Sequence, residues 1–209
     1  MTTLARILGL GLLALFGTAL VASFGSGSFT AHMIVHMGTV AVAAPLIAYG
    51  LRGTRFDPPP GTSRIGPMLA SLIELAVVWF WHLPVLREIA EASLAVTLAE
   101  QASFLAAGVL LWHACFRPGE GRLAGTVGLL FTSMHMTLLG VLLALAPRPL
   151  YGEGGVTCLG ISLTAAADQQ IGGVVMLMVG ALAYLSGGIL LLAGILRDDA
   201  GLPAEKPRC

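Results

Sequence analysis

The five histidines of this chain lie inside or at the ends of long apolar runs, where imidazoles are unusual. His32 and His36 are four residues apart, as are Met33 and Met37, so each pair lies along one stripe of a helix. Ionisable side chains are costly in a bilayer core and commonly mark functional sites. Imidazole and thioether groups together are ligands expected for Cu(I). The pattern therefore predicts a copper site within a bundle of membrane helices.

A second group of the same composition is Met134-His135-Met136, and His82 follows the aromatic run Trp79-Phe80-Trp81. That run also fits an aromatic belt at the outer membrane interface, and each methionine alone fits ordinary core packing, so both interpretations stay open. The candidate metal ligands are four histidines and four methionines: His32, His36, His82, His135, Met33, Met37, Met134 and Met136.

Two carboxylates are candidates for groups that support these ligands. Glu100 is expected at the depth of the histidines and could orient an imidazole through a hydrogen bond. Asp168 comes at the start of the last apolar run, where a helix N-cap is a better fit than metal ligation. Glu74 is expected nearer the other side of the membrane, where it could pair with Arg64 or hold a proton. His113 closes its run at the cytoplasmic end and is expected to be an interfacial residue.

Composition indicates which elements position these residues. Hydrophobic residues make up 56% of the chain and charged residues 11%, against roughly 45–50% and about 25% in soluble domains. Six apolar runs each come close to the roughly 20 residues that cross a bilayer core. They are residues 4–24, 29–51, 67–84, 94–116, 123–146 and 171–196. The sequence predicts an all-α polytopic membrane helix bundle of six transmembrane helices, with residues 1–197 as one bundle and 198–209 as a short cytoplasmic tail.

Basic residues predict the orientation. With a cytoplasmic N-terminus, nine of the eleven Lys and Arg residues fall on the inside, and only Arg87 and Arg148 fall outside. Six spans then place both termini in the cytoplasm of a bacterial inner (plasma) membrane, with His32, His36 and His82 in the outer half and His135 near the middle. The first run also resembles a signal peptide, although its long apolar core favours a retained anchor. The net charge is zero, and no basic stripe suggests a nucleic-acid partner.

The outer connection of residues 148–170 is the only outside segment large enough to present a docking surface or a lid. It is rich in glycine and carries Glu153. We expect that it does not fold as a separate domain, so that the chain is one bundle.

Six short motifs follow one another from residue 32 to residue 173. They are His32-Met33-x-x-His36-Met37, Trp81-His82-Leu83-Pro84, Glu100-x-x-Ser103-Phe104-Leu105, Met134-His135-Met136, Ala146-Pro147-Arg148-Pro149-Leu150-Tyr151 and Asp168-Gln169-Gln170-Ile171-Gly172-Gly173. In these motifs the chain resembles the CtaG-type cytochrome c oxidase assembly factors, which are polytopic bacterial membrane proteins. The family's histidines map onto His32, His36, His82 and His135. The chain departs from many relatives at Gln101, where they carry a histidine.

The resemblance implies a non-catalytic role in maturing haem-copper oxidases, with delivery of Cu(I) to the oxidase subunits. The implied partners are those subunits, periplasmic copper carriers and membrane lipid. Two other functions stay open. Paired histidines on neighbouring helices can also ligate haem, as in a membrane cytochrome. A scaffold that docks oxidase subunits would instead hold its histidines in hydrogen bonds.

Overall fold

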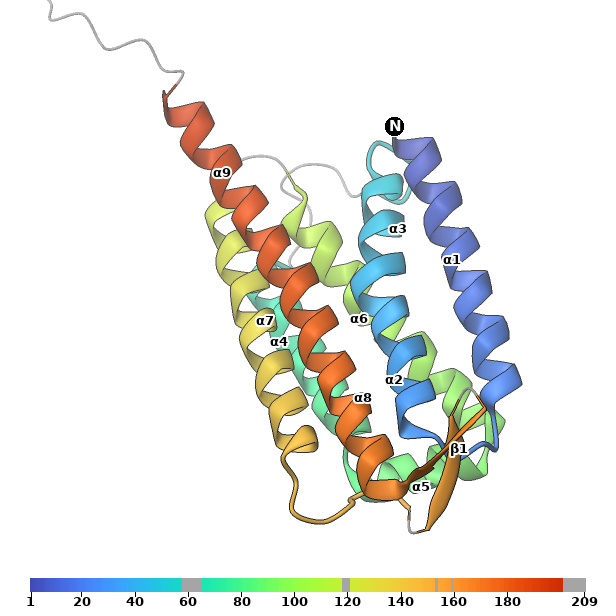
Figure 1. The fold of residues 1–209 in the computed structure, drawn as a ribbon. Helices are drawn as coiled ribbons and strands as arrows, with labels where there is room; N and C mark the ends of the chain where they lie inside the picture. The colour runs from blue at the N-terminus through green and yellow to red at the C-terminus, as the bar shows by residue number, and fades with distance from the viewer. Residues whose placement is uncertain (58–64, 118–120, 153, 159, 201–209) are drawn as a thin grey trace, which may run out of the picture.

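The computed structural model describes residues 1–57, 65–117, 121–152, 154–158 and 160–200, which form an elongated bundle of helices (Figure 1). The helical elements are α1 (Thr2–Ser23), α2 (Phe29–Met37), η1 (Gly38–Ala43), α3 (Ala44–Leu51), α4 (Pro67–Trp81), α5 (Pro84–Ala92), α6 (Leu94–Cys115), α7 (Gly121–Ala144), α8 (Ala165–Gly180), η2 (Ala181–Leu185) and α9 (Ser186–Ala200). The strands are β1 (Gly155–Cys158) and β2 (Ile161–Thr164). The predicted all-α membrane fold class is confirmed.

Five helical segments of the described chain are long and apolar enough to cross a membrane. They are Thr2–Ser23, Phe29–Leu51, Leu94–Cys115, Arg122–Ala144 and Ala165–Arg197. The remaining predicted span is divided into α4 and α5, whose axes meet at 72°. Counted as one broken span, this pair brings the total to the predicted six.

The break between α4 and α5 follows from Pro84. Proline lacks the N–H that a helix interior needs but suits a first helical turn. Accordingly α4 ends at Trp81, His82 caps it, and Pro84 begins α5. The predicted run of residues 67–84 is therefore longer than the helix it contains. The short α5 crosses the lower end of the bundle (Figure 1), and this crossing carries Arg87 to a buried position.

The second span contains wide π-helical turns in η1, directly after His36 and Met37. Pro45 explains their position. It has no N–H to donate to the carbonyl of Ala41 four residues earlier, so a regular α-helix would leave that acceptor unpaired. Wider turns of this kind commonly lie at functional sites.

Helices α7 and α8 approach each other through glycines. A Cβ on Gly140 would lie 2.8 Å from the backbone nitrogen of Leu177, and one on Gly173 would lie 2.7 Å from that of Ala144. Helix pairs in membranes associate closely where small residues allow it. Helix α8 also packs against α2, where Gly172 makes room for the ring of Phe29. These contacts hold α2 in the interior of the bundle.

The prediction that Asp168 caps its own helix is wrong. Thr164 caps α8, and its hydroxyl accepts from the Ala167 N–H at 3.2 Å. The buried carboxylate of Asp168 instead binds the start of α2. It accepts hydrogen bonds from the Ser28 hydroxyl (2.9 Å) and from the N–H groups of Phe29 (2.6 Å) and Thr30 (3.2 Å). The first N–H groups of a helix have no partner within it, and a negative charge is favoured there.

Two features beside the last span were not predicted. The connection of residues 148–170 contains an antiparallel hairpin, in which Gly155 pairs with Thr164 and Cys158 with Ile161. Helix α9 continues to Ala200, beyond the predicted start of the tail at residue 198, while residues 201–209 lie outside the described part. The start of α1 and the end of α9 lie at one end of the bundle, and the hairpin lies at the other (Figure 1).

This arrangement predicts that reporters at the two ends lie on opposite sides of the membrane. A phosphatase reporter, active only outside the cytoplasm, should be active after Gly155 and inactive after Asp57, because basic residues gather at the Asp57 end. A fluorescent reporter that matures only in the cytoplasm provides the reciprocal control. Equal phosphatase activity at both sites, or the reverse pattern, would contradict the orientation.

Candidate functional site

Three of the predicted ligands come together near the hairpin end of the bundle. His32 and His36 from α2 and His82 from the end of α4 form what we call the histidine cluster. The ring centres of His36 and His82 are 5.6 Å apart, and those of His32 and His36 are 6.4 Å apart and almost parallel. The ring of Phe104 from α6 lies 4.0 Å from His36 and supports it from the side. All three imidazoles are buried.

The cluster contains ring nitrogens without partners. His82 donates from Nδ1 to the carbonyl of Val78 at 2.7 Å, because a carbonyl oxygen can only accept. This hydrogen bond fixes the tautomer and leaves a lone pair on Nε2, as in many metal-ligating histidines. Within the described residues, His82 Nε2 and both ring nitrogens of His36 are buried with no hydrogen-bond partner. Such groups cost free energy unless a ligand satisfies them.

His32 differs because both of its nitrogens meet charged groups. Its Nδ1 lies 2.8 Å from Nη1 of Arg87, a guanidinium nitrogen that can only donate. Nδ1 is therefore the acceptor, and the proton of the neutral ring lies on Nε2. That atom is 3.3 Å from Oε1 of Glu100, a contact without hydrogen-bond geometry. Glu100 thus lies beside an imidazole, as the sequence suggested.

Arg87 is the residue that sequence analysis missed. It was counted as a loop cation, but it is buried and contacts Glu91 at 3.0 Å and Glu100 at 3.6 Å in addition to His32. The available signal was the spacing of Arg87 and Glu91, which is that of an ion pair on a helix. The structure therefore adds the cation of Arg87 and the carboxylate of Glu91 to the edge of the cluster, beside the expected Glu100.

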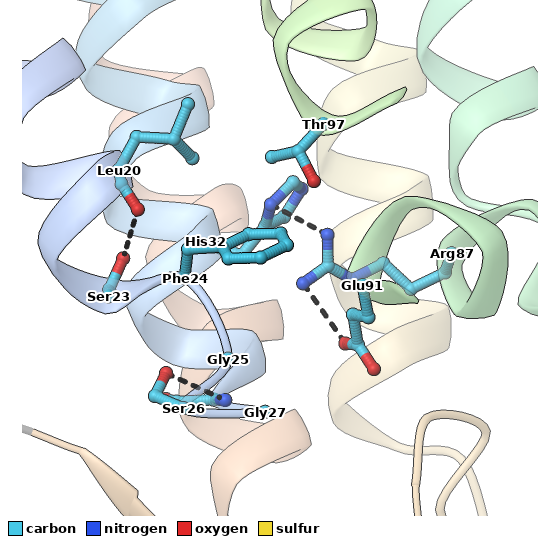
Figure 2. Close-up of a pocket in the computed structure, with 11 residues that line it drawn as sticks. Leu20, Ser23, Phe24, Gly25, Ser26, Gly27, His32, Arg87, Glu91 and Thr97 are labelled. Carbon is cyan, nitrogen blue, oxygen red and sulfur yellow. Dashed lines mark hydrogen bonds and ion pairs between the residues drawn. The ribbon is translucent and has the colours of Figure 1, made fainter. Parts of the chain in front are cut away.

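A small pocket leads to the point where His32 and Arg87 meet (Figure 2). Its volume is about 40 Å³, enough for one or a few water-sized groups. The wall opposite α5 is the tight turn between α1 and α2, where Gly25 and Gly27 have φ values of 81° and 66°. Of the three histidines of the cluster, His32 lines this pocket.

Tyr151 holds the backbone of the cluster from the outer connection. Its hydroxyl donates to the carbonyl of His82 at 2.8 Å, and its ring stacks on Phe29 at 4.4 Å. The sequence marked Tyr151 only as part of a motif. The structure makes it a positioning residue for His82 at the break between α4 and α5.

The methionines lie on other faces. Met33 packs beside Gly172 and Met37 beside Gly180, so both face α8, and Met136 of α7 meets the same glycine as Met37. These three side chains are buried next to the cluster's helix. Met134 is 62% exposed on the outside of α7. Its prediction as a ligand is wrong. Met134 lies two residues before the buried Met136, and two residues of helix turn a side chain to nearly the opposite face.

His135 and Gln101 stand apart from the cluster. His135 is buried against Phe131 at 5.7 Å, and in the described chain no ring contact or hydrogen bond joins it to the other histidines. Its predicted place beside His32 and His36 is therefore not supported. Gln101, at the position where the resemblance leads one to expect histidine, is also buried, and its amide has no partner among the described residues.

Glu74 and His113 belong to the other half of the bundle. The Tyr184 hydroxyl donates to Glu74 Oε1 at 2.7 Å. Arg64, the alternative partner for Glu74, lies outside the described residues. His113 Nε2 is 3.1 Å from Asp57 Oδ1, in the connection after α3. His113 thus lies far along α6 from Glu100, as expected for a residue at the opposite interface.

No group of three or more His, Cys, Asp or Glu side chains within the described ranges is already arranged to hold a metal ion. The cluster nevertheless has the donor chemistry for a soft cation, because three imidazole nitrogens are unpaired and carboxylates lie nearby. Ligation would require the rings to rotate toward a common point.

Comparison with models of protein families identifies the family of this chain. A family model described as cytochrome c oxidase caa3 assembly factor (Caa3_CtaG) matches residues 1–198. The chain belongs to this family. Comparisons with curated proteins and with solved structures found no match. The family gives this membrane protein a role in the assembly of cytochrome c oxidase, with the oxidase as its partner.

The contacts of Arg87 predict a large stability effect. Replacing it with alanine leaves Glu100 buried without its cation, which should lower the free energy of unfolding by about 3 kcal/mol. Adding Glu100→Gln should recover part of the loss. Thermal unfolding of the purified protein in detergent measures both, with Arg148→Ala as a control, since Arg148 is exposed at the same end. An Arg87→Ala protein as stable as the wild type would contradict the buried ion-pair network.

Proposed function

We propose that this assembly factor carries Cu(I) as cargo on the histidine cluster and passes it to haem-copper oxidase subunits. The observation that carries the proposal is the set of unpaired buried nitrogens on His36 and His82. A buried imidazole with no hydrogen bond is unfavourable, and a metal ion would supply the missing partner. His36 and His82 would form the first pair of ligands.

Cu(I) suits this donor set better than the other candidates. Imidazole also binds zinc, so a preference for the softer cuprous ion would need a thioether. The candidates are Met33, Met37 and Met136, which are buried on the α8 side of the helix that carries His32 and His36. The pocket beside His32 is too small for haem. The pocket beside His32 measures about 40 Å³, whereas sites for drug-sized ligands span about 300–1,000 Å³.

Arg87 controls the charge of the site in this proposal. Its guanidinium balances one of the two carboxylates, Glu91 and Glu100, and so leaves negative charge to compensate a monovalent cation. An ion that reached His32 would displace the guanidinium from Nδ1, while Glu91 still held it. His32 would then be a third ligand, available only after Arg87 moves.

The proposed setting is the bacterial inner membrane, with both termini in the cytoplasm and the cluster toward the outside. The distribution of basic residues supports this orientation. Copper would then arrive from the periplasmic side, and soluble copper carriers would be further partners. The scaffold hypothesis remains the alternative, and the cellular experiment below distinguishes it.

Copper titration tests the site directly. The reduced, purified protein should bind Cu(I) in competition with a chromogenic Cu(I) chelator and should prefer it to Zn(II). The double variant His36→Ala, His82→Ala should lose most of the bound copper. His113→Ala should bind normally because His113 lies at the other end of α6, and His135→Ala should keep most binding. Unchanged copper content in the double variant would refute the proposed ligands.

The cellular prediction concerns oxidase maturation. Cells without this protein should make oxidase polypeptides but show low cytochrome c oxidase activity, because a copper centre stays unfilled. His36→Ala should reproduce the deletion, and His113→Ala should restore activity. Added copper should rescue part of the activity, since mass action replaces a delivery step. Full activity with His36→Ala would instead favour a scaffold whose histidines are structural.

A further inference from the structure

A second buried polar group lies in the half of the bundle away from the histidine cluster. Glu74 of α4 is completely buried, and so is Tyr184 of η2, whose hydroxyl donates to Glu74 Oε1 at 2.7 Å. The other carboxyl oxygen, Oε2, is buried and has no hydrogen-bond partner among the described residues. Copper binding at the histidine cluster does not involve this carboxyl. An unpartnered polar atom in the interior is costly, so it points to a ligand that the carboxyl can hold.

Wide helical turns place Tyr184 in this position. It lies in η2, a π-helical segment of the last span, and such segments are frequent at functional sites. Its ring stacks on the ring of Trp112, with centres 5.4 Å apart and planes inclined by 17°. The Trp112 indole N–H in turn donates to the carbonyl of Val40 at 3.3 Å. The second span, α6 and the last span therefore together hold the tyrosine hydroxyl against Glu74.

Two hydroxyl groups continue from Glu74 toward the end of the bundle that carries the termini. Thr132 of α7 interacts with the Glu74 carboxyl, and its hydroxyl oxygen lies 2.6 Å from that of Ser71. The Ser71 hydroxyl also lies 3.1 Å from the carbonyl of Gly128. Ser71 precedes Glu74 by three residues and so lies about one turn nearer the start of α4. Hydroxyl groups both donate and accept, so this row of groups can pass a proton along.

The donor set suits a proton better than a metal ion. No group of three or more His, Cys, Asp or Glu side chains that could hold a metal ion occurs in the described chain, and hard cations take about six or more oxygen ligands. The ion pairs of the described residues do not include Glu74. An isolated carboxylate in an apolar interior is far more costly than a carboxylic acid, so such a group holds a proton. Cys115 is the other ionisable side chain near Glu74 and Tyr184, and its thiol donates to the carbonyl of Gly125 at 3.6 Å.

We propose that Glu74 and Tyr184 form a proton-binding site, which exchanges its proton with the end of the bundle that carries the termini through Thr132 and Ser71. The bound proton lies on Oε2 of Glu74. On release, Glu74 gives this proton to the Thr132 hydroxyl, Thr132 gives its own hydrogen to Ser71, and Ser71 gives its own to water that enters from that end. Each hydroxyl keeps one hydrogen, so one proton moves. The hydrogen bond from Tyr184 stabilises the carboxylate that remains, and the site does not depend on copper binding at the other end.

Infrared spectroscopy of the full-length protein in detergent tests the bound proton. A protonated carboxyl group has a C=O stretching band that a carboxylate lacks, so the wild type at neutral pH should show one such band that is lost in Glu74→Gln. In Tyr184→Phe the band should remain but move to higher frequency, because the hydrogen bond to Oε1 is lost.

Two results would overturn the bound proton. If Glu74→Gln leaves every protonated-carboxyl band in place, Glu74 is ionised in the wild type, whether it pairs with Arg64 or not. If the band disappears when sodium chloride replaces choline chloride at constant pH, the site belongs to a sodium ion instead.

Exchange into deuterated water tests the route, since the band moves to lower frequency when a deuteron replaces the bound proton. Ser71→Ala and Thr132→Val should each slow this exchange about tenfold, the effect on a rate of losing one hydrogen bond. Ser133→Ala is the matched control and should exchange like the wild type. Ser133 adjoins Thr132 on α7 and makes no hydrogen bond to Ser71 or Glu74 in the described chain. Exchange at the wild-type rate in both Ser71→Ala and Thr132→Val would overturn the proposed route.

Discussion

The carboxylate of Asp168 is the interaction on which the site depends. It satisfies the first N–H groups of α2, while the Thr30 hydroxyl donates at 2.7 Å to the backbone carbonyl of the same residue. The first turn of α2 is thereby joined to the first turn of α8. Phe29 and Thr30 are buried, so these N–H groups need a partner from the protein. Because His32 and His36 follow within two turns, this junction sets their depth and the direction in which they face.

Buried polar groups of the bundle differ in whether they have hydrogen-bond partners. Most buried polar side chains of the bundle have partners: Ser71 contacts Thr132 at 2.6 Å, and Gln169 donates to the carbonyl of Leu143 at 3.0 Å. His36 does not, although it lies in the same interior. A scaffold would be expected to hold its imidazoles as firmly as it holds Gln169. His135 and Gln101 are also unpaired, so it is the closeness of the His36 and His82 rings, together with their free nitrogens, that supports the proposal that they hold cargo.

The sequence predicted the features that depend on local hydropathy and on the rise of a helix per residue. Five spans, the shared depth of His32, His36 and His82, and the nearness of Glu100 to an imidazole all follow from distances along the chain. Rotation about a helix axis does not follow from them. Met134 is exposed, Met136 is buried, and His135 between them is buried without a described ring contact or hydrogen bond to the cluster. Arg87 was missed because hydropathy treats a charged residue after a proline as an exposed loop, and the partner of Asp168 is known only when α2 and α8 are packed.

Irregular backbone surrounds the histidine cluster, and in the proposed function it would suit a site that has to release its copper ion. The π-helical turns of η1 begin two residues after His36, and the helix break between α4 and α5 lies at His82. Each unpaired buried nitrogen costs about 1–3 kcal/mol, so an incoming ion is stabilised by satisfying it. Arg87 opposes that gain, because its hydrogen bond to His32 must break before a third imidazole can bind. When the ion leaves, the return of Arg87 to His32 and Glu100 offsets part of the lost ligation. A bound state favoured by two free imidazoles and opposed by one guanidinium would hold copper without trapping it.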